Sequence, residues 1–253
     1  MSKCFSIICH ECKMQLKRIA TWIVLFAASA IALTDNLPTV GNLARLEFLV
    51  QPTYFIYRTM SLDALIMIFG LMFLLSSSFP LDRKTEVKSL IMASPVTKWQ
   101  YILGKLLGGF LYTVVMLTLF LVLNAIAYLI VAPFDVSVTD CLVPLIKTLV
   151  VSVLPVSVFI SFTSVALPAA MDMRLFYLLA SALFFVNASS VGSAGQMPFY
   201  MITSGDLTKF IWQHPKWPFV NAGSVQANLI FLVGCGLTSG ILLFLKRKFW
   251  RAE

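Results

Sequence analysis

The sequence predicts an all-α integral membrane protein with six transmembrane helices, and three observations support this prediction. Hydrophobic residues make up 59% of the 253 positions and charged residues only 12%, whereas a soluble domain is about a quarter charged. Apolar runs recur along the chain at about the 20 residues that a bilayer-spanning helix needs. The runs are continuous rather than alternating, which favours helices over a β-barrel. They lie near residues 19–34, 59–80, 99–132, 142–169, 174–190 and 224–246.

The basic residues predict that both termini lie on the cytoplasmic face of the cell membrane. With the N-terminus inside, 14 of the 19 Lys and Arg residues fall on the inner side and 5 on the outer side, as the positive-inside rule requires. The formal net charge of +8 is therefore a topology signal. We expect anionic lipid headgroups, and no nucleic acid, as its partners.

Residues 1–18 are patterned as an amphipathic helix that precedes the first span. Apolar residues recur at helical spacing, and the intervening positions are polar, so we expect this helix to lie in the inner membrane interface. The alternative is that it forms the polar start of a long first span. The apolar stripe comprises Phe5, Ile8, Cys9, Cys12, Leu16 and Ile19, and the polar side comprises Lys3, Ser6, His10, Lys13 and Lys17.

The same segment raises the question of a metal site. Cys9 and Cys12 have a Cys-x-x-Cys spacing, with Cys4 and His10 nearby, and cysteine and histidine are zinc ligands. Cys9 and Cys12 fall on the predicted apolar stripe, however, where free cysteine behaves as a small hydrophobic residue. We therefore expect no metal site, and no disulfide on the reducing cytoplasmic side.

Three features qualify the individual spans. Pro155 should kink the fourth, because proline removes a backbone hydrogen bond. Gly104, Gly108 and Gly109 give the third a thin face, which is typical of close helix packing. The apolar run of the fifth weakens early, and residues 189–222 alternate short apolar pieces with Gly and Pro. We expect these residues to form short re-entrant helices in the outer leaflet, or else a cap folded over the spans.

Little of the sequence is suited to catalysis. The chain has two histidines, His10 and His214, on opposite predicted sides, and no G-x-x-x-x-G-K-[ST] phosphate loop. The chain itself is thus expected to bind no cofactor and not to be an enzyme. The scarcity of ionisable residues at the predicted midplane also disfavours an intramembrane enzyme and an ion-coupled secondary transporter.

The most charged internal stretch lies between the second and third spans, and it predicts a cytosolic helix at 82–96. Asp82 can cap this helix and Pro95 ends it. Val87, Leu90 and Ile91 form an apolar stripe between the charges of Arg83, Lys84, Glu86 and Lys88. An exposed cytosolic helix with such a stripe requires a groove to bury it, either on the membrane or on a partner protein.

The stretch "TEVKSLIMASPVTKWQYILGKLLGG" resembles the signature region of the ABC-2 family of ABC-transporter permeases. In that family a cytosolic helix ends in a similar Ala/Ser-Pro-Val-Ser/Thr pattern and a Gly-Lys pair enters the third span. The six-span layout, with an amphipathic start and a broken segment before the last span, extends the resemblance over residues 1–253 as a single transmembrane domain. The matching residues are Glu86, Ala93, Ser94, Pro95, Val96, Thr97, Lys98, Gly104 and Lys105.

The resemblance implies half of a dimeric exporter, paired with a second permease chain as a homodimer or heterodimer. Two copies of a separate ATP-binding subunit would hold ATP and Mg, and 82–96 would be the coupling helix that docks on them. The docking residues would be Arg83, Lys84, Glu86, Val87, Leu90, Ile91 and Pro95. The alternative is a non-transporting sensor or immunity complex that binds a peptide at the outer 189–222 segment.

The near absence of charge at the predicted midplane indicates an amphipathic or hydrophobic substrate such as a peptide, lipid or drug. Asp63 and Lys147 lie near the outer ends of their spans, where snorkelling or mutual pairing is the alternative to a substrate contact. The remaining polar candidates have ordinary interhelical hydrogen bonding as their alternative. The candidate substrate-path residues are Asp63, Asn124, Lys147, Ser161 and Asn187.

Overall fold

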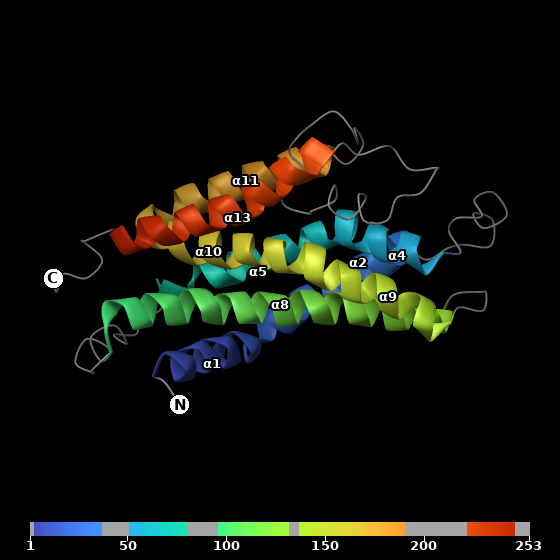
Figure 1. Ribbon diagram of the computed structural model, residues 1–253, viewed down its shortest axis with the longest axis horizontal. Coiled ribbons are helices and arrows are strands. Elements are labelled where there is room, and N and C mark those ends of the chain that lie inside the picture. The colour runs from blue at the N-terminus through green and yellow to red at the C-terminus, as the bar shows by residue number, and fades with distance from the viewer. Residues whose placement is uncertain (1–2, 37–50, 80–95, 132–136, 191–221, 246–253) are drawn as a thin grey trace.

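The computed structural model describes residues 3–36, 51–79, 96–131, 137–190 and 222–245, and within these ranges the chain is helical with no strand. The helices run back and forth along the long axis of the molecule (Figure 1). In order they are α1 (Lys3–Leu16), α2 (Ile19–Asn36), α4 (Pro52–Arg58), η2 (Thr59–Asp63), α5 (Ala64–Ser76), α8 (Lys98–Val131), α9 (Val138–Thr148), η3 (Leu149–Val153), α10 (Leu154–Ala170), α11 (Met173–Ser190) and α13 (Ala222–Leu245).

Apart from a turn at Ser77, every predicted apolar run is helical where it is described. The chain is a membrane protein by the length and hydropathy of these helices. Lys98–Val131, Val138–Ala170 and Gln226–Leu245 are each long and apolar enough to cross a bilayer. Cys4–Leu16 and Ile19–Thr34 add a fourth span if this pair, bent by 63°, is counted as one. Ala64–Ser76 and Met173–Ala188 are shorter apolar helices.

Two π-helical turns interrupt the longer helices, and one of them explains how the chain accommodates Pro155. The predicted kink does not break the fourth run, since Val138–Ala170 is one continuous helix. Pro155 has no N–H to donate to the carbonyl one turn back. The π-turn η3 precedes it directly, and the Leu154 N–H donates to the Leu149 carbonyl. π-helical turns are rare and occur mostly as single widened turns inside α-helices, frequently at functional sites.

One end of the bundle gathers α1, the start of α8, the α10–α11 turn and the end of α13 (Figure 1). Contacts tie the start of α8 to the end of α13 there. The Lys98 ammonium donates to the Phe244 carbonyl at 2.9 Å, and Trp99 stacks on Phe244 with ring centroids 4.2 Å apart. The first and last described residues of the chain therefore lie at the same end of the molecule.

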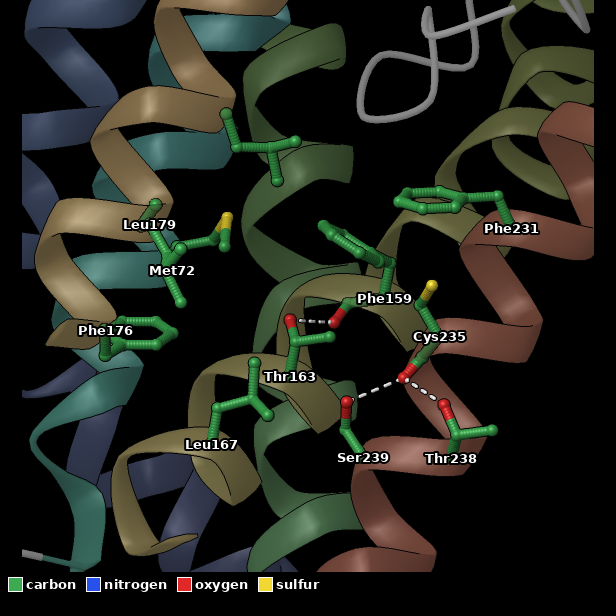
Figure 2. Close-up of a pocket in the computed structure, with 12 residues that line it drawn as sticks. Met72, Phe159, Thr163, Leu167, Phe176, Leu179, Phe231, Cys235, Thr238 and Ser239 are labelled. Atoms are coloured by element: carbon green, nitrogen blue, oxygen red, sulfur yellow. Dashed lines mark hydrogen bonds between the residues drawn. The ribbon is translucent and has the colours of Figure 1, made fainter. Parts of the chain in front are cut away.

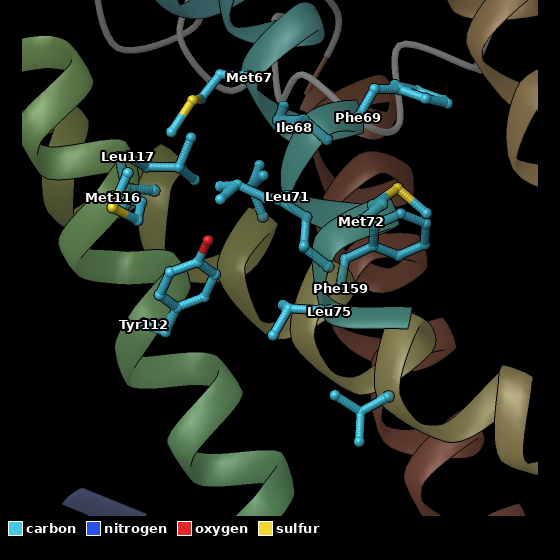
Figure 3. Close-up of a cluster of buried hydrophobic side chains, with 14 of the residues drawn as sticks. Met67, Ile68, Phe69, Leu71, Met72, Leu75, Tyr112, Met116, Leu117 and Phe159 are labelled. Atoms are coloured by element: carbon cyan, nitrogen blue, oxygen red, sulfur yellow. The ribbon is translucent and has the colours of Figure 1, made fainter. Parts of the chain in front are cut away.

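The core lies around α5, which packs against α2, α8, α10 and α11. Nine of its 13 residues are buried, so this helix is enclosed on nearly all sides. Tyr112 and Met116 from α8 and Phe159 from α10 approach it (Figure 3). Side-chain packing of this kind holds helices together inside a bilayer, where lipid tails are as apolar as the core itself.

Candidate functional site

The predicted docking residues, Arg83 to Pro95, lie outside the described residues, but both sides of that segment are described. On the C-terminal side Thr97 caps α8. The Thr97 N–H donates to the Gln100 side chain at 3.1 Å, and the Gln100 N–H donates back to the Thr97 hydroxyl at 3.4 Å. This reciprocal pair is a capping box, and it fixes where the third apolar helix begins.

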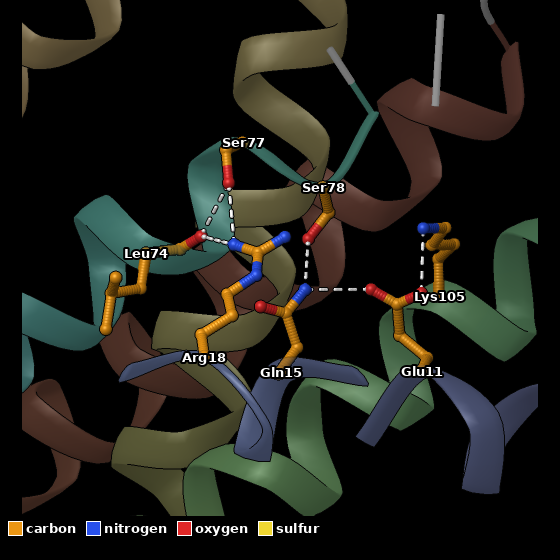
Figure 4. Close-up of polar contacts among 7 residues, drawn as sticks. All are labelled: Glu11, Gln15, Arg18, Leu74, Ser77, Ser78 and Lys105. Carbon is orange, nitrogen blue, oxygen red and sulfur yellow. Dashed lines mark hydrogen bonds and ion pairs between the residues drawn. The ribbon is translucent and has the colours of Figure 1, made fainter. Parts of the chain in front are cut away.

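On the N-terminal side, α5 ends in a cluster of polar contacts that also involves α1 and α8 (Figure 4). At its centre the Lys105 ammonium lies 2.7 Å from a Glu11 carboxylate oxygen, and both side chains are only 5% exposed. A buried charge is costly unless it is paired, so this ion pair fixes α1 against α8. We call the cluster the polar junction; it comprises Glu11, Gln15, Arg18, Ser77, Ser78 and Lys105.

Gln15 and Arg18 connect this ion pair to the end of α5. The Gln15 amide donates to the second Glu11 oxygen at 2.9 Å and to the Ser78 hydroxyl at 3.0 Å. The Arg18 guanidinium donates to the Leu74 carbonyl at 3.1 Å and to the Ser77 hydroxyl at 2.9 Å. The two described ends that flank residues 80–95 are therefore held to the same short helix.

The bend between α1 and α2 is itself fixed by hydrogen bonds. The last carbonyls of a helix have no intrahelical donor, and here side chains from α2 supply one. The Thr21 hydroxyl donates to the Gln15 carbonyl and the Trp22 indole donates to the Leu16 carbonyl, both at 2.9 Å. Thr21 also shares a hydrogen bond with the Tyr112 hydroxyl of α8 at 3.0 Å.

The predicted thin face of α8 is confirmed as a close packing surface. A Cβ on Gly104 would lie 2.4 Å from Ile7, and one on Gly108 would lie 2.7 Å from the Glu11 Cβ. Both positions face α1, whereas Gly109 faces α5 and α10 at ordinary contact distance. Only glycine allows α1 to approach α8 this closely, and this approach brings Glu11 within reach of Lys105.

The packing of α1 differs from the predicted two-sided pattern. Its contact face carries Glu11, Cys12 and Gln15, all buried, while Phe5 is 48% exposed and Cys9 is exposed. The predicted apolar stripe is thus divided between the surface that packs on α8 and one that points away from the bundle. Sequence reasoning missed Glu11 and Gln15, although Glu11 is the only acidic residue before Asp35 and Gln15 stands one turn after it.

The cysteines of α1 sit in different surroundings. Cys12 is buried, and this burial, with smaller effects from Cys9 and Glu11, raises the pKa of its thiol above the ordinary value. A thiol of raised pKa is a poor nucleophile and metal ligand at neutral pH. Within the described residues no group of three or more His, Cys, Asp or Glu side chains is arranged to hold a metal ion.

The candidate substrate-path residues are distributed over five elements. Asp63 is buried at the end of η2, whereas Lys147 is exposed on α9. Ser161, Asn124 and Asn187 are buried, and each donates to the carbonyl four residues earlier on its own helix. Asn124 also reaches the Ser29 hydroxyl of α2 at 3.4 Å. The interhelical hydrogen bond expected as an alternative role is therefore present for Asn124.

A cavity of about 240 Å³ lies between α11 and α13. Figure 2 shows residues of α11 on one side, residues of α13 on the other, and α10 with Met72 of α5 between them. Its surface is predominantly apolar, and no sequence pattern predicts it. The lining residues are Met72, Phe159, Thr163, Leu167, Phe176, Leu179, Ala180, Leu183, Phe231, Cys235, Thr238 and Ser239.

Comparison with known proteins does not add a relative: no protein-family model, no curated protein and no solved structure matches the chain.

Proposed function

We propose that this chain is the transmembrane permease subunit of an ABC exporter, which moves an amphipathic or hydrophobic substrate outward. ATP and Mg would bind to two separate ATP-binding subunits, and a second permease chain would complete the channel. The observation that carries the proposal is the ABC-2-like stretch of residues 82–109, together with the polar junction that holds both of its flanking helices to α1.

The proposal takes six crossings from the six apolar runs. In this reading α4, η2 and α5 form one span that passes through a π-turn, and α11 forms another. Both termini and the 82–96 segment would then lie in the cytoplasm. The gathering of α1, the start of α8 and the end of α13 at one end of the bundle supports this topology.

The polar junction supports a mechanical role for α1. Under the proposal, ATP-driven closure of the partner subunits moves the 82–96 helix, and the movement must reach α5 and α8. Because Gln15 and Arg18 bind the end of α5 while Glu11 binds Lys105 of α8, the three helices would move as one unit. The movement of the 82–96 helix would then reach the bundle without separating α5 from α8.

The decisive test is whether the apolar stripe of 82–96 binds an ATP-binding subunit. Leu90→Asp with Ile91→Asp should abolish co-purification with an ATP-binding subunit, because two carboxylates would enter an apolar groove. The matched control is Thr85→Asp with Ser89→Asp, which adds the same charge on the opposite face of the expected helix and should leave co-purification intact. Normal co-purification of the Leu90/Ile91 variant would contradict the proposal.

A further inference from the structure

We infer that the cavity between α11 and α13 binds one hydrocarbon chain of an amphipathic lipid, whose polar end presents a hydrogen-bond donor to Asn187. The inference rests on the proposed function, because it names the class of substrate that the exporter would move. It follows from the size, lining and position of the cavity and from a buried acceptor one helical turn from its lining.

The size of the cavity suits part of a molecule. Sites that enclose a whole drug-sized ligand have volumes of about 300–1,000 Å³, and this cavity has about 240 Å³. The cavity therefore has room for only part of a lipid. We take that part to be one hydrocarbon chain, with the polar end of the lipid outside the cavity.

The three hydroxyl groups in the cavity lining have no proton left to donate to an occupant. Thr163 donates to the Phe159 carbonyl, Thr238 to the Gly234 carbonyl and Ser239 to the Cys235 carbonyl, each within its own helix. The hydroxyl protons are therefore already used, and the remaining surface is aliphatic, aromatic and sulfur-bearing. A hydrogen-bond acceptor placed here would lose its hydration without finding a donor, so the lining favours hydrocarbon.

The cavity can be reached from the side of the bundle. Leu179, which lines it, is 49% exposed, and Thr238 is also exposed. The neighbouring surfaces of α11 and α13 carry outward apolar side chains, including Leu178 at 67% and Ile241 at 56% exposed. In a bilayer such surfaces face lipid tails, so a chain can enter from the membrane without crossing water.

Asn187 supplies the polar half of the site. It stands one helical turn beyond Leu183, which lines the cavity, and residues four apart share a helix face. Its side chain is 2% exposed, and its Nδ2 donates to the Leu183 carbonyl at 2.8 Å. Its Oδ1 accepts no hydrogen bond from any described residue. A buried acceptor in this state favours a ligand that carries an N–H or O–H donor.

A photoreactive lipid tests the chain-binding step directly. The full-length protein is placed in phosphatidylcholine nanodiscs with a trace of phosphatidylethanolamine that carries a diazirine in one acyl chain, and labelled peptides are identified after illumination. Labelling should concentrate on the cavity-lining residues of α11 and α13. Leu183→Trp, which fills the cavity, should remove this labelling, whereas Leu178→Trp on the outward face should retain it.

The same assay tests the headgroup. The ethanolamine head carries N–H donors and the choline head carries none. Labelling of the wild-type protein should therefore be about fivefold stronger with the ethanolamine probe than with a choline probe that carries the same diazirine, which is the ratio expected for one net hydrogen bond. Asn187→Leu should abolish this preference and keep the labelling itself. Equal labelling of Leu183→Trp and Leu178→Trp would overturn the inference; this result is expected if residues 191–221, rather than lipid, occupy the cavity. A preference for the ethanolamine probe that survives Asn187→Leu would also overturn it.

Binding and transport are separable. The labelling needs no ATP-binding subunit, so it remains interpretable if the proposed function fails. With the ATP-binding subunit present, Leu183→Trp should also reduce outward lipid movement in vesicles, and Leu178→Trp should not. If both variants move lipid equally while labelling differs, the cavity binds lipid but is not on the substrate path, which overturns the assignment of substrate class.

Discussion

The contact between α1 and α8 and the seam between α11 and α13 are packed in opposite ways. At the first, Gly104 and Gly108 leave no room for even a Cβ, and a buried ion pair links the helices. At the second, two helices are separated by a cavity of about 240 Å³, and its hydroxyls bond only to their own helices. The first contact specifies one register, whereas at the second α11 and α13 pack on α5 and α10 rather than closely on each other.

This difference matches the two tasks that the proposed function assigns. A segment that receives force from a partner must transmit it without slipping, and a close contact held by a buried ion pair has few alternative arrangements. A segment that admits a chain from the bilayer must yield, and loosely packed apolar surfaces can repack at low cost. Matched changes in the two regions test this contrast.

The largest effect is expected from Lys105→Met. This variant leaves the Glu11 carboxylate buried with only the Gln15 amide as donor, and breaking one side of a buried ion pair costs about 3–5 kcal/mol. Adding Glu11→Gln removes the buried charge and should recover most of the loss. Denaturant unfolding in micelles measures both variants. A double variant no more stable than Lys105→Met would show that the pair does not hold α1 in place.

Next in size is the contrast between two identical glycine changes. Gly108→Ala places a Cβ 2.7 Å from the Glu11 Cβ and 3.0 Å from the Ile8 carbonyl oxygen, so α1 must move away, at about 1–3 kcal/mol. Gly234→Ala meets nothing within 4 Å, and the gain in helix propensity should stabilise α13 by about 0.5–1 kcal/mol. Melting temperatures that shift in the same direction would contradict the comparison.

Much of this architecture follows from the sequence because its causes are local. Apolar runs predict the helices, and the glycines of α8 predict a close contact. The partner of Glu11 is not local: it depends on the register in which α1 lies against α8, and only the short link from Glu11 to Gln15 follows a helical spacing. The α11–α13 cavity was equally unpredictable, since it is a shape made by four helices and has no signature in any one of them.

Two cysteine changes extend the contrast at a smaller scale. Cys235→Leu adds carbon atoms to the lining of the α11–α13 cavity, and cavity filling should stabilise the protein by about 1 kcal/mol. Cys12→Leu makes the same change on the contact face of α1, where the side chain is 7% exposed, and overpacking should destabilise it by a similar amount. Thermal unfolding of the two variants side by side checks the opposite signs. Cys235→Leu should also reduce labelling of the cavity by the photoreactive lipid, because the larger side chain occupies part of the cavity.

The smallest effect is expected at Thr163, and its size tests whether the cavity hydroxyls are as isolated as their geometry indicates. Thr163→Val removes a hydroxyl that donates only within α10, so the free energy of unfolding should change by no more than about 0.6 kcal/mol. Thr21→Val removes a hydroxyl that joins the Gln15 carbonyl to Tyr112, and should cost about 1–2 kcal/mol. If Thr163→Val cost as much as Thr21→Val, the hydroxyl would have a second role in the cavity, and a purely hydrocarbon occupant would no longer follow from its lining.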